Sequence, residues 1–186
     1  MVKQVQNPLV AEANQLVELF NRCFQQRYTT RLCGGGIEPV YRPQKGDRLA
    51  EIVFTHDYFA SALHEVAHWC IAGQKRREQE DYGYWYAPDG RTEEQQMLFE
   101  KVEVKPQAME WIFTKACGQR FHLSSDNLNS DIGASHEFKL AVFSQVKHYC
   151  QQGLPERARN FAETLAAYYQ QSEALSCSAY SLEEIL

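Results

Sequence analysis

The residues best suited to chemistry are His64, Glu65 and His68, in the string His-Glu-Val-Ala-His. In an α-helix, positions i and i+4 lie on one face, one turn apart. Both imidazoles can therefore bind one divalent metal ion, and the glutamate beside them can act as the general base of a metallopeptidase. The string predicts a metal site on a helix, with His64 and His68 as ligands and Glu65 as the catalytic residue.

An open metal site of this kind needs a third protein ligand. Four polar residues between positions 99 and 111 fall at i, i+3, i+7 and i+10 of one helical face: Glu100, Glu103, Gln107 and Glu110. We expect Glu103 to be the third ligand, because it lies in the middle of the row and is flanked by valines, with Glu100 as the second candidate. The alternative is an acidic stripe in contact with water, since charged stripes usually face solvent.

The helix that positions the two histidines should begin after Asp57, a plausible N-cap, and run to Gly73. Apolar residues surround the motif on nearly every side of it, which predicts a buried helix. Buried imidazoles must be satisfied by some partner, and one metal ion can satisfy both. The alternative is a pair of hydrogen-bonded core histidines with Glu65 in a salt bridge. The other four histidines lack a partner at ligand spacing, although His56 lies near the helix start.

The remaining elements predict an α+β fold, mainly helical, with a small sheet. Helices are expected over 8–26, 92–118, 135–152 and 155–170, the last two packed antiparallel. The second of these should begin at Thr92 with a capping box to Gln95, bend or break at Pro106, and end at Gly118. Strands are expected over 37–41 and 50–55, paired across a turn, and over 121–123. The glycines 34–36 indicate a loop, without the spacing of a phosphate-binding motif. The helix with the two histidines should pack on the carboxylate-bearing helix, as in zincin-like folds.

Composition narrows the class of protein. A chain of 186 residues with 44% hydrophobic residues is expected to form one domain, residues 1–186. A net charge of −5 gives no basic footprint for nucleic acid. The sequence shows no signal peptide and no apolar run of membrane-spanning length, and its six cysteines form no CxxC pair. We therefore expect a cytoplasmic protein with reduced thiols. Its oligomeric state is left open.

Two histidines and one carboxylate suit two different metals. Zinc, with Glu65 as base, would hydrolyse peptide or amide bonds. Ferrous iron in a two-His-one-carboxylate site would activate O₂. The chain has no His-x-Asp or His-x-Glu pair of the type that common iron oxygenases carry on a strand. The residues by themselves therefore favour a zinc hydrolase.

A resemblance to a known family changes this preference. The stretches 64–73 (HEVAHWCIAG), 82–91 (YGYWYAPDGR) and 99–111 (FEKVEVKPQAMEW) resemble those of the bacterial elongation factor P hydroxylases, and the resemblance extends over the full chain. It implies that elongation factor P is the partner and substrate, hydroxylated on a lysine that carries a β-lysyl group. It also implies a non-haem Fe(II) site that uses O₂, on a fold unlike the usual oxygenases, with 2-oxoglutarate left open as a co-substrate.

On this resemblance His64 and His68 match the motif histidines, and Glu65 acts from beside the metal rather than as a hydrolytic base. The aromatic residues at positions 82, 84, 85 and 86 are then a wall for an alkyl chain or a cation–π partner for an ammonium, or else simply packing or flap residues. The cations at 75–77 are either a contact for an acidic partner protein or favourable charges at a helix C-terminus.

Overall fold

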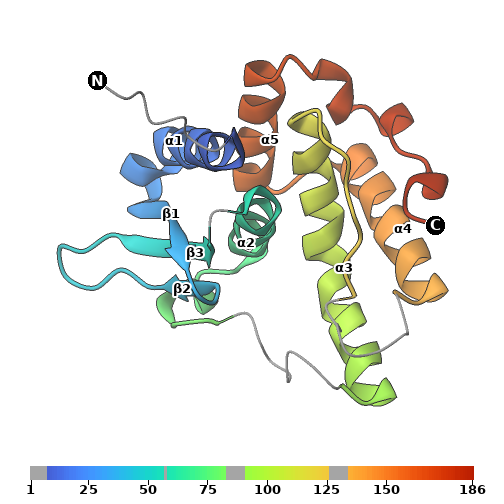
Figure 1. Ribbon diagram of the computed structural model, residues 1–186, viewed down its shortest axis with the longest axis horizontal. Helices are drawn as coiled ribbons and strands as arrows, with labels where there is room; N and C mark the ends of the chain where they lie inside the picture. Colours follow the sequence, from blue (N-terminus) through green and yellow to red (C-terminus); the bar gives the residue numbers. More distant parts are fainter. Residues whose placement is uncertain (1–7, 57, 83–90, 126–133) are drawn as a thin grey trace. The chain divides into compact units, whose positions relative to one another are not determined.

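The computed structural model describes residues 8–56, 58–82, 91–125 and 134–186 (Figure 1). Its Cα positions group the chain into two compact units, Met1–Gly83 and Tyr84–Leu186. The described residues form five α-helices and a three-stranded sheet, which confirms the predicted α+β class with mainly helical content. The single domain over 1–186 stays a prediction. Among the described residues, no helix combines the length and the apolar character that crossing a membrane requires.

The first unit contains the sheet and two α-helices. In chain order its elements are α1 (Pro8–Tyr28), β1 (Thr30–Gly36), β2 (Val40–Arg42), β3 (Ala50–Thr55), α2 (Phe59–Ile71) and the short 3₁₀ helix η1 (Arg76–Glu78). The strand order is β1-β3-β2, with β1 parallel and β2 antiparallel to β3. Helix α1 packs against β1, α2 packs against β3, and the two helices contact each other. The sheet thus gives α2 a fixed support.

Aromatic rings fill the core between these two helices. Trp69 of α2 lies with its ring centroid 5.3 Å from that of Phe20 and 5.1 Å from that of Phe24, both on α1. All three side chains are at most 3% exposed. Aromatic pairs at this separation are stabilising beyond the area that they bury. This cluster joins the helix with the two histidines to α1.

The predicted pairing of 37–41 with 50–55 is confirmed by β2 and β3, but the loop assigned to the glycines 34–36 is wrong. These glycines end strand β1, whose register with β3 shifts between Cys33 and Gly36. A Cβ on Gly36 would lie 2.8 Å from both the Glu38 carbonyl oxygen and Val53 Cγ1. The strand approaches its neighbours so closely that only glycine fits, which is a known use of glycine within strands.

The second unit is helical. Its elements are α3 (Glu93–Ala116), α4 (His136–Gln152), α5 (Glu156–Tyr168) and the 3₁₀ helices η2 (Ser172–Leu175), η3 (Cys177–Ala179) and η4 (Leu182–Glu184). The apolar stripes expected to join α4 to α5 pack instead against α3, which contacts both helices and carries the fully buried Trp111. The strand expected at 121–123 is absent from the described part of this unit. Phe121 stacks on Trp111, with centroids 5.4 Å apart, and no strand lies beside it to supply a ladder.

The ends of α3 follow the sequence closely. Thr92 and Gln95 form the predicted capping box, and Gly118, with φ +70°, follows the C-cap. A break at Pro106 is not observed, because the helix continues through it. Proline removes only the bond to the carbonyl of residue 102. The polar row on α3 therefore lies on one continuous helix.

Two predicted features fall outside the described residues. One is Asp57 as N-cap, although α2 itself begins at Phe59 with Tyr58 in the N-cap position. The other is the aromatic group at positions 82, 84, 85 and 86, of which only Tyr82 is described. Helix α2 ends at Ile71 with Ala72 as its C-cap, so Gly73 takes the predicted C′ position.

Candidate metal centre

The two motif histidines lie one turn apart on α2, and their rings meet edge to face. The Nε2 atoms of His64 and His68 are 3.0 Å apart, and the ring centroids are 4.7 Å apart. Two metal–nitrogen bonds of about 2.0–2.1 Å can span such a gap. The same separation also fits a hydrogen bond between two neutral imidazoles. The predicted convergence of both side chains on one point is therefore confirmed, and the donor pair fits a metal ion.

The expectation that these residues are buried in the core is wrong. His64, Glu65 and His68 are each half-buried, whereas the apolar residues on the remaining faces of α2 are buried. The helix carries enough apolar residues to cover most of its circumference, but the motif residues occupy the sector that is left. The histidines are thus accessible to a ligand, and two fully buried core histidines are excluded as an interpretation.

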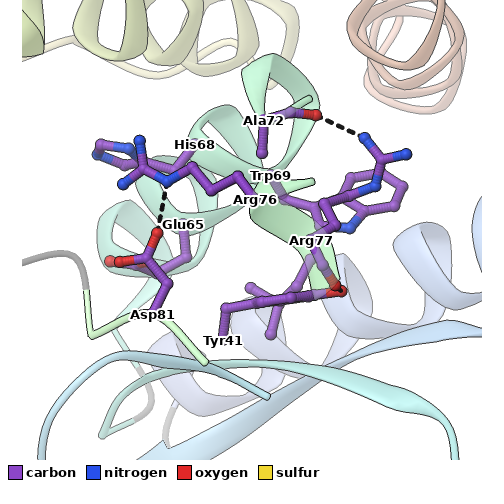
Figure 2. Close-up of a pocket in the computed structure, with 9 residues that line it drawn as sticks. Tyr41, Glu65, His68, Trp69, Ala72, Arg76, Arg77 and Asp81 are labelled. Atoms are coloured by element: carbon purple, nitrogen blue, oxygen red, sulfur yellow. Dashed lines mark hydrogen bonds and ion pairs between the residues drawn. The ribbon is translucent and has the colours of Figure 1, made fainter. Parts of the chain in front are cut away.

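A small pocket opens beside this face of α2 (Figure 2). It has a volume of about 30 Å³, which is room for about two water molecules. Glu65, His68, Trp69 and Ala72 line it from α2, Tyr41 and Ile52 from the sheet, and Arg76, Arg77 and Asp81 from the segment after α2. Every lining residue belongs to the first unit. The sequence motif identified Glu65 and His68, but no pattern in the sequence marked the other residues as neighbours of the site.

Hydrogen bonds hold the two arginines of the pocket. Arg76 Nε donates to Asp81 Oδ2 at 2.6 Å, and Arg77 Nη1 donates to the Ala72 carbonyl at 2.5 Å (Figure 2). Arg77 in turn accepts a 3.0 Å hydrogen bond at its carbonyl from the Tyr41 hydroxyl. A cation on the last carbonyls of a helix is favourable. For Arg77 the structural alternative is therefore confirmed: it caps α2.

The polar row on α3 lies in the second unit, and its members differ in what they do. All four side chains are at most 9% exposed, so the alternative interpretation as an acidic stripe in contact with water is wrong. Glu100 accepts hydrogen bonds from Ser135 N, at 3.0 Å, and from Ser135 Oγ, at 2.5 Å. Because Ser135 is the N-cap of α4, the carboxylate of Glu100 fixes the start of that helix.

Gln107 is likewise used within the second unit, where it exchanges two hydrogen bonds with the backbone of Ser124 at 2.8 and 3.0 Å. The same Gln107 Nε2 is 3.5 Å from Glu103 Oε2, which is a long contact for a hydrogen bond. Glu103 is 4% exposed. A carboxylate so deeply buried must be satisfied by a partner or a metal, so Glu103 stays the predicted third ligand in preference to Glu100.

The other histidines do not join the pair. His56 is exposed, has a positive φ of 50°, and lies against the Tyr58 ring at 5.4 Å. His122, His136 and His148 are exposed, as expected for surface histidines. Each of the six cysteines carries a free thiol. The first unit therefore contributes the imidazole pair, Glu65 and a charged pocket.

Comparison with known proteins assigns the class. The family model of the elongation factor P hydroxylases matches residues 19–180. The chain therefore belongs to this family, and the resemblance seen in its motifs is confirmed. It is 47% identical over 168 residues to the elongation factor P lysine hydroxylase of Haemophilus influenzae, an alignment that covers 90% of this chain and 94% of that protein.

Proposed function

We propose that this protein hydroxylates a lysine side chain of elongation factor P, after that lysine has received a β-lysyl group. Membership of the hydroxylase family and the activity in the name of the Haemophilus influenzae relative support this function. The observation that carries it is the family match over residues 19–180, and the convergence of His64 and His68 at 3.0 Å supplies a donor pair for the metal. A cytoplasmic location agrees with a substrate that serves translation and with free thiols.

The proposed metal ligands are His64, His68 and Glu103. Two neutral imidazoles and one carboxylate are the donor set of non-haem ferrous sites that keep open positions. When bound, Fe(II) would supply the activation of O₂ for insertion of one oxygen atom into a C–H bond, as in a monooxygenase. Glu103 is proposed because it is buried and lies within hydrogen-bonding reach of Gln107, whereas Glu100 already caps α4.

Glu65 is proposed to orient groups beside the metal ligands. It lines the pocket next to His68, where a carboxylate can accept a hydrogen bond from an imidazole N–H or hold a water molecule. The apolar surfaces of Trp69, Tyr41 and Ile52 restrict the amount of water in the same pocket. The chain thus supplies orientation and partial exclusion of water, and the cofactor supplies the redox chemistry.

The alternative function is a zinc-dependent peptidase with Glu65 as general base, which the His-Glu-Val-Ala-His string favours. Metal analysis of the purified protein separates the two. Iron with oxygen-dependent turnover supports the hydroxylase, and zinc with amide hydrolysis supports the peptidase. Glu65→Gln is a second discriminator, because it should abolish a peptidase but leave iron binding largely intact.

The direct test of the function is mass spectrometry of elongation factor P from cells with and without this protein. We expect the modified lysine to lack one oxygen atom in the deletion strain, and to regain it with the wild-type gene but not with His64→Ala. An oxygen that persists on the lysine in the deletion strain would refute the proposed function.

A further inference from the structure

The pocket beside the motif already contains an anion–cation contact. Asp81 Oδ2 accepts from Arg76 Nε at 2.6 Å, on a wall that also includes Glu65 and His68 (Figure 2). Tyr41, Ile52 and Trp69 line the same pocket with apolar surface. A pocket with an aromatic and aliphatic wall and a carboxylate that binds a cation matches a chain of methylenes ending in an ammonium group.

The two partners of this ion pair differ in how firmly they are held. Asp81 is fixed through its backbone, because its N–H and carbonyl exchange hydrogen bonds with Tyr41 of β2 at 3.0 and 2.7 Å. Its side chain is 23% exposed, against 45% for Arg76. Arg76 reaches Asp81 from the three-residue helix η1 through a long side chain that loses rotamer freedom in the contact. The anion is thus part of the sheet edge, and the cation reaches it through the longer and more exposed side chain.

We propose that Asp81 is the docking carboxylate for an ammonium group of the lysine substrate, and that Arg76 holds this position until the substrate arrives. This inference rests on the proposed function, which supplies a substrate with a long cationic side chain. Arg76 lines this cavity of about 30 Å³ together with Asp81. Exchange of one cation for another leaves Asp81 paired throughout, and the ion pair that is given up is partly exposed and therefore weak.

The exchange predicts opposite effects for the two partners. Asp81→Asn removes the docking charge and should raise the KM for modified elongation factor P about tenfold or more, with kcat changed less, since charged hydrogen bonds are the strong ones. Arg76→Ala removes the competing cation and should lower that KM about two- to fivefold, as expected for loss of a partly exposed ion pair. The matched control is Glu51→Gln, because Glu51 pairs with Arg31 and Arg42 in the same sheet but does not line the pocket. The KM of this variant for modified elongation factor P should equal that of the wild type.

Titration of fluorescently labelled, β-lysylated elongation factor P into the metal-free proteins gives a second readout, independent of turnover. It should show the same order of affinity: Arg76→Ala tightest, then wild type and Glu51→Gln, then Asp81→Asn. Asp81→Glu keeps the charge and should recover part of the affinity. If Asp81→Asn fails to fold, the sign of the Arg76→Ala effect still decides.

Two results would overturn the inference. One is a higher KM in both Arg76→Ala and Asp81→Asn, which is expected if the ion pair merely ties the segment after α2 to the sheet. The other is an unchanged KM in Asp81→Asn. These results are distinct from failure of the proposed function, which would appear earlier, as absence of oxygen insertion by the wild-type enzyme.

Discussion

Glu100 and Glu103 lie one turn apart on α3, and the structure assigns them separable tasks. Glu100 accepts two hydrogen bonds from Ser135, whose hydroxyl also caps α4 by accepting from Phe138 N at 3.0 Å. Glu100→Gln keeps one acceptor oxygen but turns an amide N–H toward the second donor. A hydrogen bond to a charged group contributes about 1.5–3 kcal/mol, so we expect the free energy of unfolding to fall by about that amount.

For a chain of this length, 1 kcal/mol corresponds to about 2–4 °C in Tm. Glu100→Gln should therefore lower the Tm by roughly 3–12 °C, measured by circular dichroism on the metal-free protein, and leave the affinity for Fe(II) unchanged in anaerobic titration with a competing chelator. Glu103→Gln is the matched comparison. Its Fe(II) affinity should drop more than about 100-fold, beyond the loss typical of residues that merely support a ligand. Loss of Fe(II) binding in Glu100→Gln with retention in Glu103→Gln would refute the assignment.

Three further predictions concern the metal, acid and thiol chemistry. Saturating Fe(II) at about 100 times its Kd should stabilise the wild-type protein by about 2.7 kcal/mol, seen as a higher Tm under anaerobic conditions, and His64→Ala should abolish the increase. Hydrogen bonds from Arg31 and Arg42 lower the pKa of Glu51 from its ordinary 4.5, so its stabilisation is present above that pH and is lost as the pH falls toward the lower folded value. The stability difference between wild type and Glu51→Gln should be less than about 1 kcal/mol, because the arginines are exposed. In denaturant titrations this difference should be constant near neutral pH and should shrink in acid. A difference that grew in acid would contradict this. Burial raises the pKa of the Cys117 thiol to about 12. After iodoacetamide treatment at pH 8, peptide mapping should therefore find Cys117 unlabelled in the folded protein and labelled in urea. Rapid labelling of the folded protein would contradict the burial of this thiol.

The sequence predicted the features that depend on local chemistry. The Thr92–Gln95 capping box and Gly118 each act within one turn of a helix end, so neighbouring residues determine them. The same holds for the imidazole pair, because the spacing of His64 and His68 places both rings on one face whatever surrounds the helix. These parts of the fold and site could therefore be derived before any tertiary contact was known.

The features that were missed depend on partners distant in sequence. The glycines of β1 indicated a loop because their tolerance within a strand depends on the close approach of β3. Asp81 became a neighbour of His68 through its backbone pairing with Tyr41, forty residues earlier. The burial of the motif was overestimated because composition tells how many apolar residues a helix has, but tertiary packing decides which sector stays open.

The imidazole pair belongs to a single helix turn within the first 83 residues, while the proposed carboxylate ligand follows on α3. During synthesis, domains generally fold as units, the N-terminal one first. A growing chain that has released α2 from the ribosome but not yet α3 would thus present two nitrogen donors to the metals of the cell without the oxygen donor. Nitrogen donors alone follow the general affinity order, in which copper and zinc outcompete ferrous iron. Loading of the proposed Fe(II) is therefore expected to depend on the timing of translation as well as on the composition of the finished site.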